Sequence, residues 1–257
     1  MDNEKYYETF DWVKFDNANE NYTNIRKLIP KDVNSIIDIG CGNGLITNKL
    51  GTEFDITGVD RSSKALELVT TTKIQASCDN IPVENNSYDL VLSSELLEHL
   101  DDQTFTKTIS EINRISNKYI LVSVPFEESL NKGMIQCPSC NLVFHRCYHM
   151  RDFSLSTFAE NFPNYEQIES MTFGLKVRVY NKTIAKVKQK LTSPVNWIPL
   201  YWTKNEDRSA MCPSCENKFN YTFKFNFISF TLDCLNVLIT KKKPFHLVVL
   251  LRKKKEI

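Results

Sequence analysis

The stretch Asp38-Ile39-Gly40-Cys41-Gly42-Asn43-Gly44 constrains the fold of this chain more than any other. It follows an apolar run, residues 35–37, which we expect to be a buried strand, and it precedes residues 45–50, which we expect to be a helix. Glycines at alternate positions let a backbone turn sharply and approach a ligand without clashes from Cβ, and a helix opening after the turn directs N–H groups at that ligand. In the dinucleotide fingerprint the acid follows the glycines, whereas here it leads them. The loop therefore suits a ligand with amino or hydroxyl groups; a tight turn without a ligand is the alternative.

Strand and helix patterns alternate after this loop. Further strands are expected at 54–60, 73–78, 88–93 and 118–125, and helices at 62–70 and 102–115. This alternation predicts an α/β fold with a mainly parallel, doubly wound sheet. Asp60 ends the second strand at about the separation from the glycines at which an acid meets ribose hydroxyls in a βαβ nucleotide site. A solvated acid at a strand end is the other interpretation.

Five segments then carry a family resemblance: 38–44, Gly58-Val59-Asp60, Asn80-Ile81-Pro82, 87–94 and 96–100. In this order they resemble class I S-adenosylmethionine (SAM)-dependent methyltransferases of type 11, over about residues 33–125. The resemblance implies a seven-stranded Rossmann-like sheet, with the methionine end of SAM on the 38–44 loop and the ribose hydroxyls on Asp60. The cofactor-binding residues that it implies are Asp38, Gly40, Cys41, Gly42, Asp60, Arg61, Cys78, Asp79 and Ser94. Ser77 stands where the family often has Asp, which leaves Ser77 and Asp79 as alternatives for the adenine amine.

The eight cysteines are expected to be reduced thiols or metal ligands. The first residues lack the basic-then-apolar pattern of a signal peptide, and polar residues interrupt the longest apolar region, 223–239, so no transmembrane segment is expected. We therefore expect a cytoplasmic protein without disulfides.

Two matched Cys-Pro-Ser-Cys segments predict a zinc site. Cys137, Cys140, Cys212 and Cys215 have the spacing of two zinc knuckles that together supply four thiolates. Alternating apolar residues after each knuckle, at 142–144 and 219–227, predict strands, and the whole resembles a zinc ribbon assembled from two insertions. His145, Cys147 or His149 can replace a cysteine as a ligand. Because both insertions are expected to leave the carboxyl edge of the sheet, we expect a structural zinc beside the substrate mouth.

The expected organisation divides the chain into six segments: an N-terminal helical lid at 1–30, the SAM-binding core at 31–126, a first zinc-knuckle insertion at 127–152, more core at 153–174, a second insertion at 175–243, and a final core strand with a basic tail at 244–257.

Methyl transfer to a small acceptor is the activity that the resemblance implies. His149, His145 and His99, in that order, are the candidate bases for an acceptor hydroxyl; packing or surface histidines are the alternative. Residues 137–154 also resemble, more loosely, methyltransferases of surface-polysaccharide gene clusters, which implies a saccharide or saccharide-linked oxygen as the acceptor.

Other functions remain open. The zinc ribbon of an RNA methyltransferase could grip nucleic acid, but the net charge of +1 argues against a nucleic-acid partner. A non-catalytic interaction protein with this fold is a second alternative. Lysines and aromatics at 181–208 fit single-stranded nucleic acid, a sugar nucleotide or a solvated helix, and the basic runs 241–243 and 252–255 fit either weak association with an anionic membrane or a solubilising edge.

Overall fold

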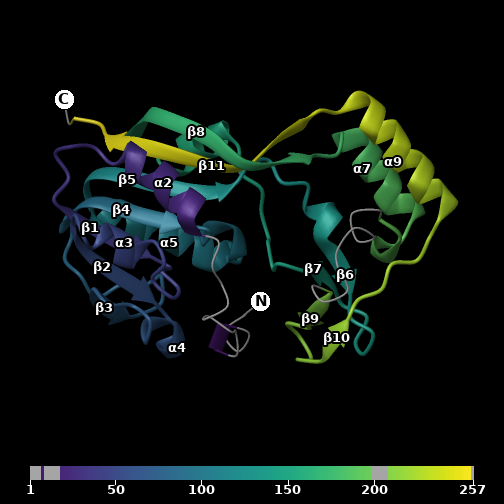
Figure 1. Cartoon of the computed structure of the whole chain (residues 1–257), viewed down its shortest axis with the longest axis horizontal. Coiled ribbons are helices and arrows are strands. Elements are labelled where there is room, and N and C mark those ends of the chain that lie inside the picture. Colours follow the sequence, from purple (N-terminus) through teal and green to yellow (C-terminus); the bar gives the residue numbers. More distant parts are fainter. Residues whose placement is uncertain (1–6, 9–17, 198–207, 256–257) are drawn as a thin grey trace. The chain divides into compact units, whose positions relative to one another are not determined.

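The computed structural model describes residues 7–8, 18–197 and 208–255 (Figure 1). Most aromatics of the expected lid (Tyr6, Phe10, Trp12 and Phe15) lie outside the described residues, as do Tyr201 and Trp202. The chain forms two compact units. The sheet unit comprises the described residues of Glu4–Phe126, Phe153–Gly174 and Phe245–Ile257, and the insertion unit those of Glu127–Asp152 and Leu175–Pro244.

A seven-stranded sheet in the order β3-β2-β1-β4-β5-β11-β8 organises the sheet unit. Its strands are β1 (Ser35–Ile39), β2 (Asp55–Asp60), β3 (Thr72–Gln75), β4 (Tyr88–Ser94), β5 (Ser116–Pro125), β8 (Tyr165–Arg178) and β11 (Lys242–Lys253). The first five pair in parallel, whereas β11 runs antiparallel to β5. The expectation of a mainly parallel, seven-stranded, Rossmann-like sheet is therefore confirmed.

Helices cover both faces of the sheet. Alternate residues of one strand enter two separate cores: Ile37 and Ile39 pack with α5 (Asp102–Ile115) and α6 (Leu155–Asn161), whereas Ile36 packs with α2 (Ala18–Leu28). Because successive side chains of a strand point to opposite faces, a strand buried on both sides must be apolar throughout. Residues 36–39, which are all buried, meet this condition except at Asp38.

Some expected boundaries are wrong. The helix expected at 62–70 is only α4 (Ser63–Leu66), although Ser62 caps its N-terminus as expected by accepting a hydrogen bond from Ala65 N. The helix that follows the glycine loop is α3 (Thr47–Leu50). The alternating aromatics at 219–227 form a strand only over β10 (Lys218–Asn220), and Phe227 already begins α9 (Phe227–Ile239).

Among the described residues of the insertion unit are two short hairpins and the two helices α7 (Lys182–Leu191) and α9. The hairpins are β6 (Met134–Gln136) with β7 (Val143–His145), and β9 (Ser209–Met211) with β10. Helix α7 packs beside α9 around the buried Trp197, Tyr180 and Ala185. Short 3-10 turns lie at Leu130–Gly133 and Pro194–Asn196. Among the described residues, no helix combines the length and apolar character that a membrane crossing needs.

Candidate cofactor and metal sites

The expected cofactor residues come together at one edge of the sheet. Strands β2, β1 and β4 are parallel neighbours, with Asp38 paired to Gly58 on one side and to Leu92 on the other. Their carboxyl ends therefore meet at the same edge, where ligands bind in open α/β sheets. This places the 38–44 loop between Asp60, the last residue of β2, and Ser94, the last residue of β4.

The glycines of the loop adopt conformations that other residues rarely adopt. Gly40, Gly42 and Gly44 have φ angles of 78°, 53° and 76°, in the left-handed region where glycine carries no steric penalty. A Cβ at Gly40 would lie 2.8 Å from Leu96 Cδ2. The N–H groups of Gly40 and Cys41 both donate to Val59 O, at 2.8 and 3.0 Å, and so hold the loop against β2.

Asp60 binds the loop directly. Its two carboxylate oxygens accept hydrogen bonds from Gly42 N and Ser62 N, both at 2.9 Å. Burial raises the pKa of Asp60, and the N–H donors of Ser62 and Gly42 act in the opposite direction. A carboxylate oxygen has two lone pairs, so each oxygen can still accept a ligand hydroxyl.

Asp38 is a buried acid with one unused oxygen. Its Oδ2 accepts a hydrogen bond from Thr47 Oγ1 at 2.6 Å, whereas Oδ1 has no hydrogen-bond partner among the described residues. Burial raises the pKa of Asp38 from 3.8 to about 7, although the Thr47 hydrogen bond lowers it. A buried acceptor without a donor is costly, and a ligand amino group at this edge would satisfy it. The residues thus fit the amino-acid end of SAM.

The remaining cofactor candidates differ in their surroundings. The Ser94 hydroxyl, like that of Ser93, is buried without a hydrogen-bond partner among the described residues. Arg61 is exposed, and its guanidinium lies 5.8 Å from the centre of the Tyr7 ring. Burial strongly raises the pKa of the Cys41 thiol, and its sulfur would lie 2.9 Å from a Cβ at Gly58.

The 77–85 loop after β3 holds the two alternatives for the adenine contact. The Ser77 hydroxyl donates to Asp79 Oδ1, so the two side chains are bonded to each other. Lys107 Nζ lies 3.8 Å from Asp79 Oδ2. Cys78 Sγ accepts a hydrogen bond from Thr108 Oγ1 at 3.3 Å, and burial raises the pKa of this thiol.

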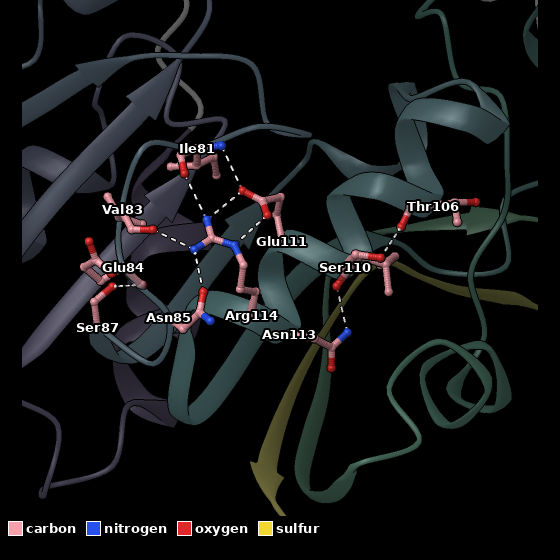
Figure 2. Close-up of polar contacts among 11 residues, drawn as sticks. Ile81, Val83, Glu84, Asn85, Ser87, Thr106, Ser110, Glu111, Asn113 and Arg114 are labelled. Atoms are coloured by element: carbon pink, nitrogen blue, oxygen red, sulfur yellow. Dashed lines mark hydrogen bonds and ion pairs between the residues drawn. The ribbon is translucent and has the colours of Figure 1, made fainter.

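Arg114, which the sequence did not single out, anchors this loop (Figure 2). From the last turn of α5 its guanidinium donates to Val83 O at 2.6 Å, to Ile81 O at 2.9 Å and to the Asn85 side chain at 3.0 Å. Glu111 pairs with the same guanidinium and accepts from Ile81 N at 2.8 Å. One guanidinium therefore fixes the backbone on both sides of Pro82.

A histidine–glutamate pair at the same edge was also missed. His246 Nδ1 lies 3.2 Å from Glu95 Oε1, which also accepts a hydrogen bond from Ser123 Oγ. His246 pairs with Pro125 at the carboxyl end of β5, and Glu95 directly follows Ser94 with a φ of 54°. The Phe173 ring stacks on the imidazole with ring centres 5.1 Å apart. The expected base His99 also lies in the sheet unit, in the 3-10 turn Leu97–His99, with Nε2 4.0 Å from Glu98 Oε1.

In the insertion unit, the structure brings the four expected cysteines together. The sulfur atoms of Cys137, Cys140, Cys212 and Cys215 all lie within 4.8 Å of one another. Two short contacts join one knuckle to the other: Cys137 to Cys215 at 3.6 Å and Cys140 to Cys212 at 3.5 Å. Burial raises the pKa of Cys137, but N–H donors of Cys140 and Ser139 outweigh it and lower the pKa to about 6. A thiolate is the form that binds a metal.

The two knuckles have the same internal geometry. In each hairpin the N–H of the first cysteine donates to the carbonyl five residues later, at 2.9 Å for both Cys137 and Cys212. The carbonyl of the same cysteine accepts from the N–H four residues later, at 3.0 Å for Cys137 and 2.9 Å for Cys212. The residue after each second cysteine, Asn141 or Glu216, has a φ of about 59° or 58°. The two hairpins therefore present their cysteines from matching turns, and the four sulfur atoms could together hold one metal ion.

The other expected bases lie in the insertion unit and share one carboxylate. Glu128 bonds His149 Nδ1 through Oε2, and its Oε1 lies 3.7 Å from His145 Nε2. Burial raises the pKa of Glu128, but the hydrogen bond and charge of His149 outweigh it and lower the pKa overall. Burial lowers the pKa of His145 to about 4, so this imidazole is neutral at pH 7. Its Nδ1 accepts from His149 N at 3.3 Å, and the rings stack with centres 4.9 Å apart.

The family to which this chain is similar matches residues of the sheet unit. Residues 37–118 match the family described as methyltransferase domain. The chain is 32% identical over 127 residues to an uncharacterized protein of Methanocaldococcus jannaschii, covering 48% of this chain and 54% of that protein. It is 28% identical over 134 residues to the ubiquinone biosynthesis O-methyltransferase of Albidiferax ferrireducens, covering 42% of this chain and 52% of that protein. The chain thus spans about half the length of the curated relatives it matches.

A solved structure extends the similarity in fold. The SAM-dependent methyltransferase from Archaeoglobus fulgidus superposes with a TM-score of 0.54 at 15% identity, over 91% of this chain and 93% of that one. The chain therefore has the Rossmann-like methyltransferase fold, with the matched family segment holding the glycine loop, Asp60 and the 77–85 loop.

Proposed function

We propose that this chain is a SAM-dependent methyltransferase that transfers a methyl group to an oxygen of a small acceptor. The observation that carries the proposal is the edge formed by the glycine loop, Asp38 and Asp60, which lies within the segment matched to the methyltransferase domain. The sulfonium of bound SAM supplies the activated methyl group, so the protein has to bind, align and deprotonate.

Two acids and the loop define the cofactor-binding half of the proposed site. Asp38 Oδ1 is placed to accept from the amino group of the ligand, and the carboxylate of Asp60 to accept from vicinal hydroxyls while it holds Gly42 N. The Ser94 hydroxyl adds a donor at the same edge. The 77–85 loop, fixed by Arg114, is the proposed border of the adenine, with Ser77 and Asp79 as its polar side chains.

Deprotonation of an acceptor hydroxyl needs a base oriented by a second group. Two histidines have this arrangement: His149 with Glu128 in the insertion unit, and His246 with Glu95 at the sheet edge. In each pair a carboxylate that accepts from Nδ1–H leaves the imidazole lone pair on Nε2, where it can take a proton. His145 and His99 are the further candidates.

The acceptor class is proposed from the relatives. Ubiquinone biosynthesis O-methyltransferases among them support an oxygen acceptor. A saccharide or saccharide-linked hydroxyl is the finer proposal, supported by the resemblance of residues 137–154 described above. Saccharides and intermediates of ubiquinone biosynthesis therefore both belong in one acceptor screen.

Zinc held by the four cysteines is proposed as a structural ion. Four thiolates close a tetrahedral site and leave no position for a substrate. In this role the ion joins two hairpins whose cysteines lie more than 70 residues apart in sequence, with spacings of 72 and 78 residues. The four sulfur atoms of the site and the matching turns of the two hairpins support this assignment.

Calorimetric titration with SAM and S-adenosylhomocysteine tests the cofactor proposal. We expect micromolar binding to the wild type, and a loss of about 1–3 kcal/mol of binding free energy in Asp60→Ala. Asp60→Asn keeps an acceptor for Gly42 N and should lose less. Wild type that binds neither ligand, while its melting curve shows a folded protein, would refute the proposal.

Kinetics of matched pairs identify the base. Glu128→Gln and Glu95→Gln each disorient one imidazole, and His149→Ala and His246→Ala remove it. The two variants of the pair that serves the reaction should have a kcat lowered by about 10²–10⁴-fold and an unchanged affinity for SAM. The two variants of the other pair are the control. If turnover survives in all four variants and in His145→Ala and His99→Ala, no histidine is the base.

A further inference from the structure

Helix α9 buries its polar side chains and exposes its apolar ones. Ser229, Asp233 and Asn236 are buried. Asp233 forms an ion pair with the fully buried Lys188 of α7, and Ser229 Oγ donates to Asn196 O at 2.6 Å. These polar contacts fix which face of the helix packs inside the insertion unit, and so which face is turned outward.

The outward face is mostly apolar, and the exposed Thr231 on it donates its hydroxyl to Phe227 O of the same helix. The exposed fractions of Leu238, Phe227 and Ile239 are 81%, 72% and 60%, and Ile228 and Leu235 are exposed as well. At 100° per residue these side chains lie on the side opposite the buried Asp233, which is the one charged residue of the helix. Single exposed apolar residues are normal, but a contiguous apolar stripe marks an interaction site.

Exposed lysines lie on α7, which packs beside α9, and directly after α9 in the chain. Segments 175–193 and 224–244 together contain ten Lys and Arg residues and a single acid, Asp233. Lys182, Lys186 and Lys190 are exposed at spacings of four residues along α7, and Lys241 and Lys242 are exposed directly after α9. The surroundings of the apolar face are therefore strongly basic, although the whole chain has a net charge of +1.

We propose that α9 docks onto the surface of an anionic phospholipid bilayer. An apolar helical face bordered by lysines is the pattern of a helix that lies in the interface plane, with its side chains among the acyl chains and its cations at the phosphates. Thirteen residues at 1.5 Å each extend about 20 Å, which is too short to cross a hydrocarbon core of about 30 Å.

The lysines favour a bilayer over a protein partner. Protein–protein interfaces are depleted in lysine, and a second copy of this chain packed on the same face would bring like charges together. An anionic lipid surface satisfies the apolar face and the lysines at once. Docking of α9 needs no methyl transfer, so it can be tested without an acceptor.

Co-sedimentation of the full chain with vesicles tests the docking. Vesicles of phosphatidylcholine alone are compared with vesicles that contain about one third phosphatidylglycerol, at low and at high salt. The variants are Phe227→Gln/Leu238→Gln for the apolar face and Lys186→Gln/Lys190→Gln for the basic border. Ile168→Gln, an exposed apolar residue of β8 in the sheet unit, is the matched control. Melting curves and SAM titration of each variant verify the fold.

We expect the wild type and Ile168→Gln to bind phosphatidylglycerol vesicles, with weaker binding at high salt. Both double variants should bind at least about tenfold more weakly. The proposal is overturned if the wild type ignores anionic vesicles, or if Phe227→Gln/Leu238→Gln binds them as the wild type does. It is equally overturned if the same variant abolishes a dimer in solution while vesicles have no effect, because the face then belongs to a second copy.

Discussion

Replacement of Asp38 by Asn should remove a loss of stability that the wild type shows as pH rises. The folded protein raises the pKa of Asp38 from 3.8 to about 7 because it buries the carboxylate. A raised pKa means that the folded state binds a proton which the unfolded state releases, so stability is fully present below pH 3.8 and is lost as pH rises towards 7. The difference between a pKa of 3.8 in the unfolded state and about 7 in the folded state corresponds to about 4 kcal/mol of unfolding free energy.

The Asn side chain removes this dependence. Its carbonyl oxygen can still accept from Thr47 Oγ1, but it carries no charge at any pH, and its buried amide adds a constant cost. The comparison should therefore use the change with pH and not the absolute stability. Relative to the wild type, Asp38→Asn should gain up to about 4 kcal/mol between pH 4 and pH 8.

Urea unfolding at half-unit pH intervals measures this gain, with Asp89→Asn as the control. Asp89 accepts hydrogen bonds from Asn34 N at 2.9 Å and pairs with Lys118 at 3.0 Å, and its pKa is lowered overall although burial opposes the shift. Its stabilising contribution is present above pH 3.8 and is lost as pH falls, so Asp89→Asn should lose stability relative to the wild type as pH rises. Parallel curves for wild type and Asp38→Asn would refute the reasoning. Titration with SAM should show weaker binding to Asp38→Asn, by about 10–100-fold.

Three further changes probe the other features. Arg114→Met removes the donors to Ile81 O and Val83 O and should cost about 1–3 kcal/mol in urea unfolding, with SAM affinity reduced; equal stability would contradict the clamp. Cys212→Ser should lower bound zinc from one equivalent to none by elemental analysis, and full retention of zinc would exclude the four-thiolate site. Gly133→Ala places a Cβ that overlaps His145 Nε2 and so should displace the side chains of Glu128, His145 and His149. If these residues serve catalysis, kcat should fall while SAM affinity stays unchanged, and an unchanged kcat would count against this role.

The fold and the cofactor edge were predictable because their signals are local. The glycine loop and Asp60 follow buried strands directly, so strand order and chain direction place them together. The thiolate cluster was predictable because each knuckle carries its own spacing. Contacts across long stretches of sequence have no such signal: Glu128 meets His149 21 residues away, and Glu95 meets His246 151 residues away.

Helix α9 escaped prediction for a different reason. Its aromatics continue an alternating pattern that begins at Phe219, and its polar residues look like interruptions of an apolar run. Only the partners of these polar residues, which lie on α7 and at Asn196, reveal that they form the inner face. Arg114 is similar, because an arginine in the last turn of a helix usually faces solvent.

The position of β11 has a consequence for synthesis on the ribosome. In the sheet, β11 lies between β5 and β8, so β8 joins the other strands only through a strand that is translated after it. Between the end of β8 at Arg178 and the start of β11 at Lys242, most of the insertion unit must emerge. During that interval the nascent chain exposes an unpaired edge on β5 and a detached β8, both of which invite aberrant pairing. The rate at which the residues between β8 and β11 are translated, or a chaperone bound to β5 or β8 during that interval, would therefore affect the yield of native protein.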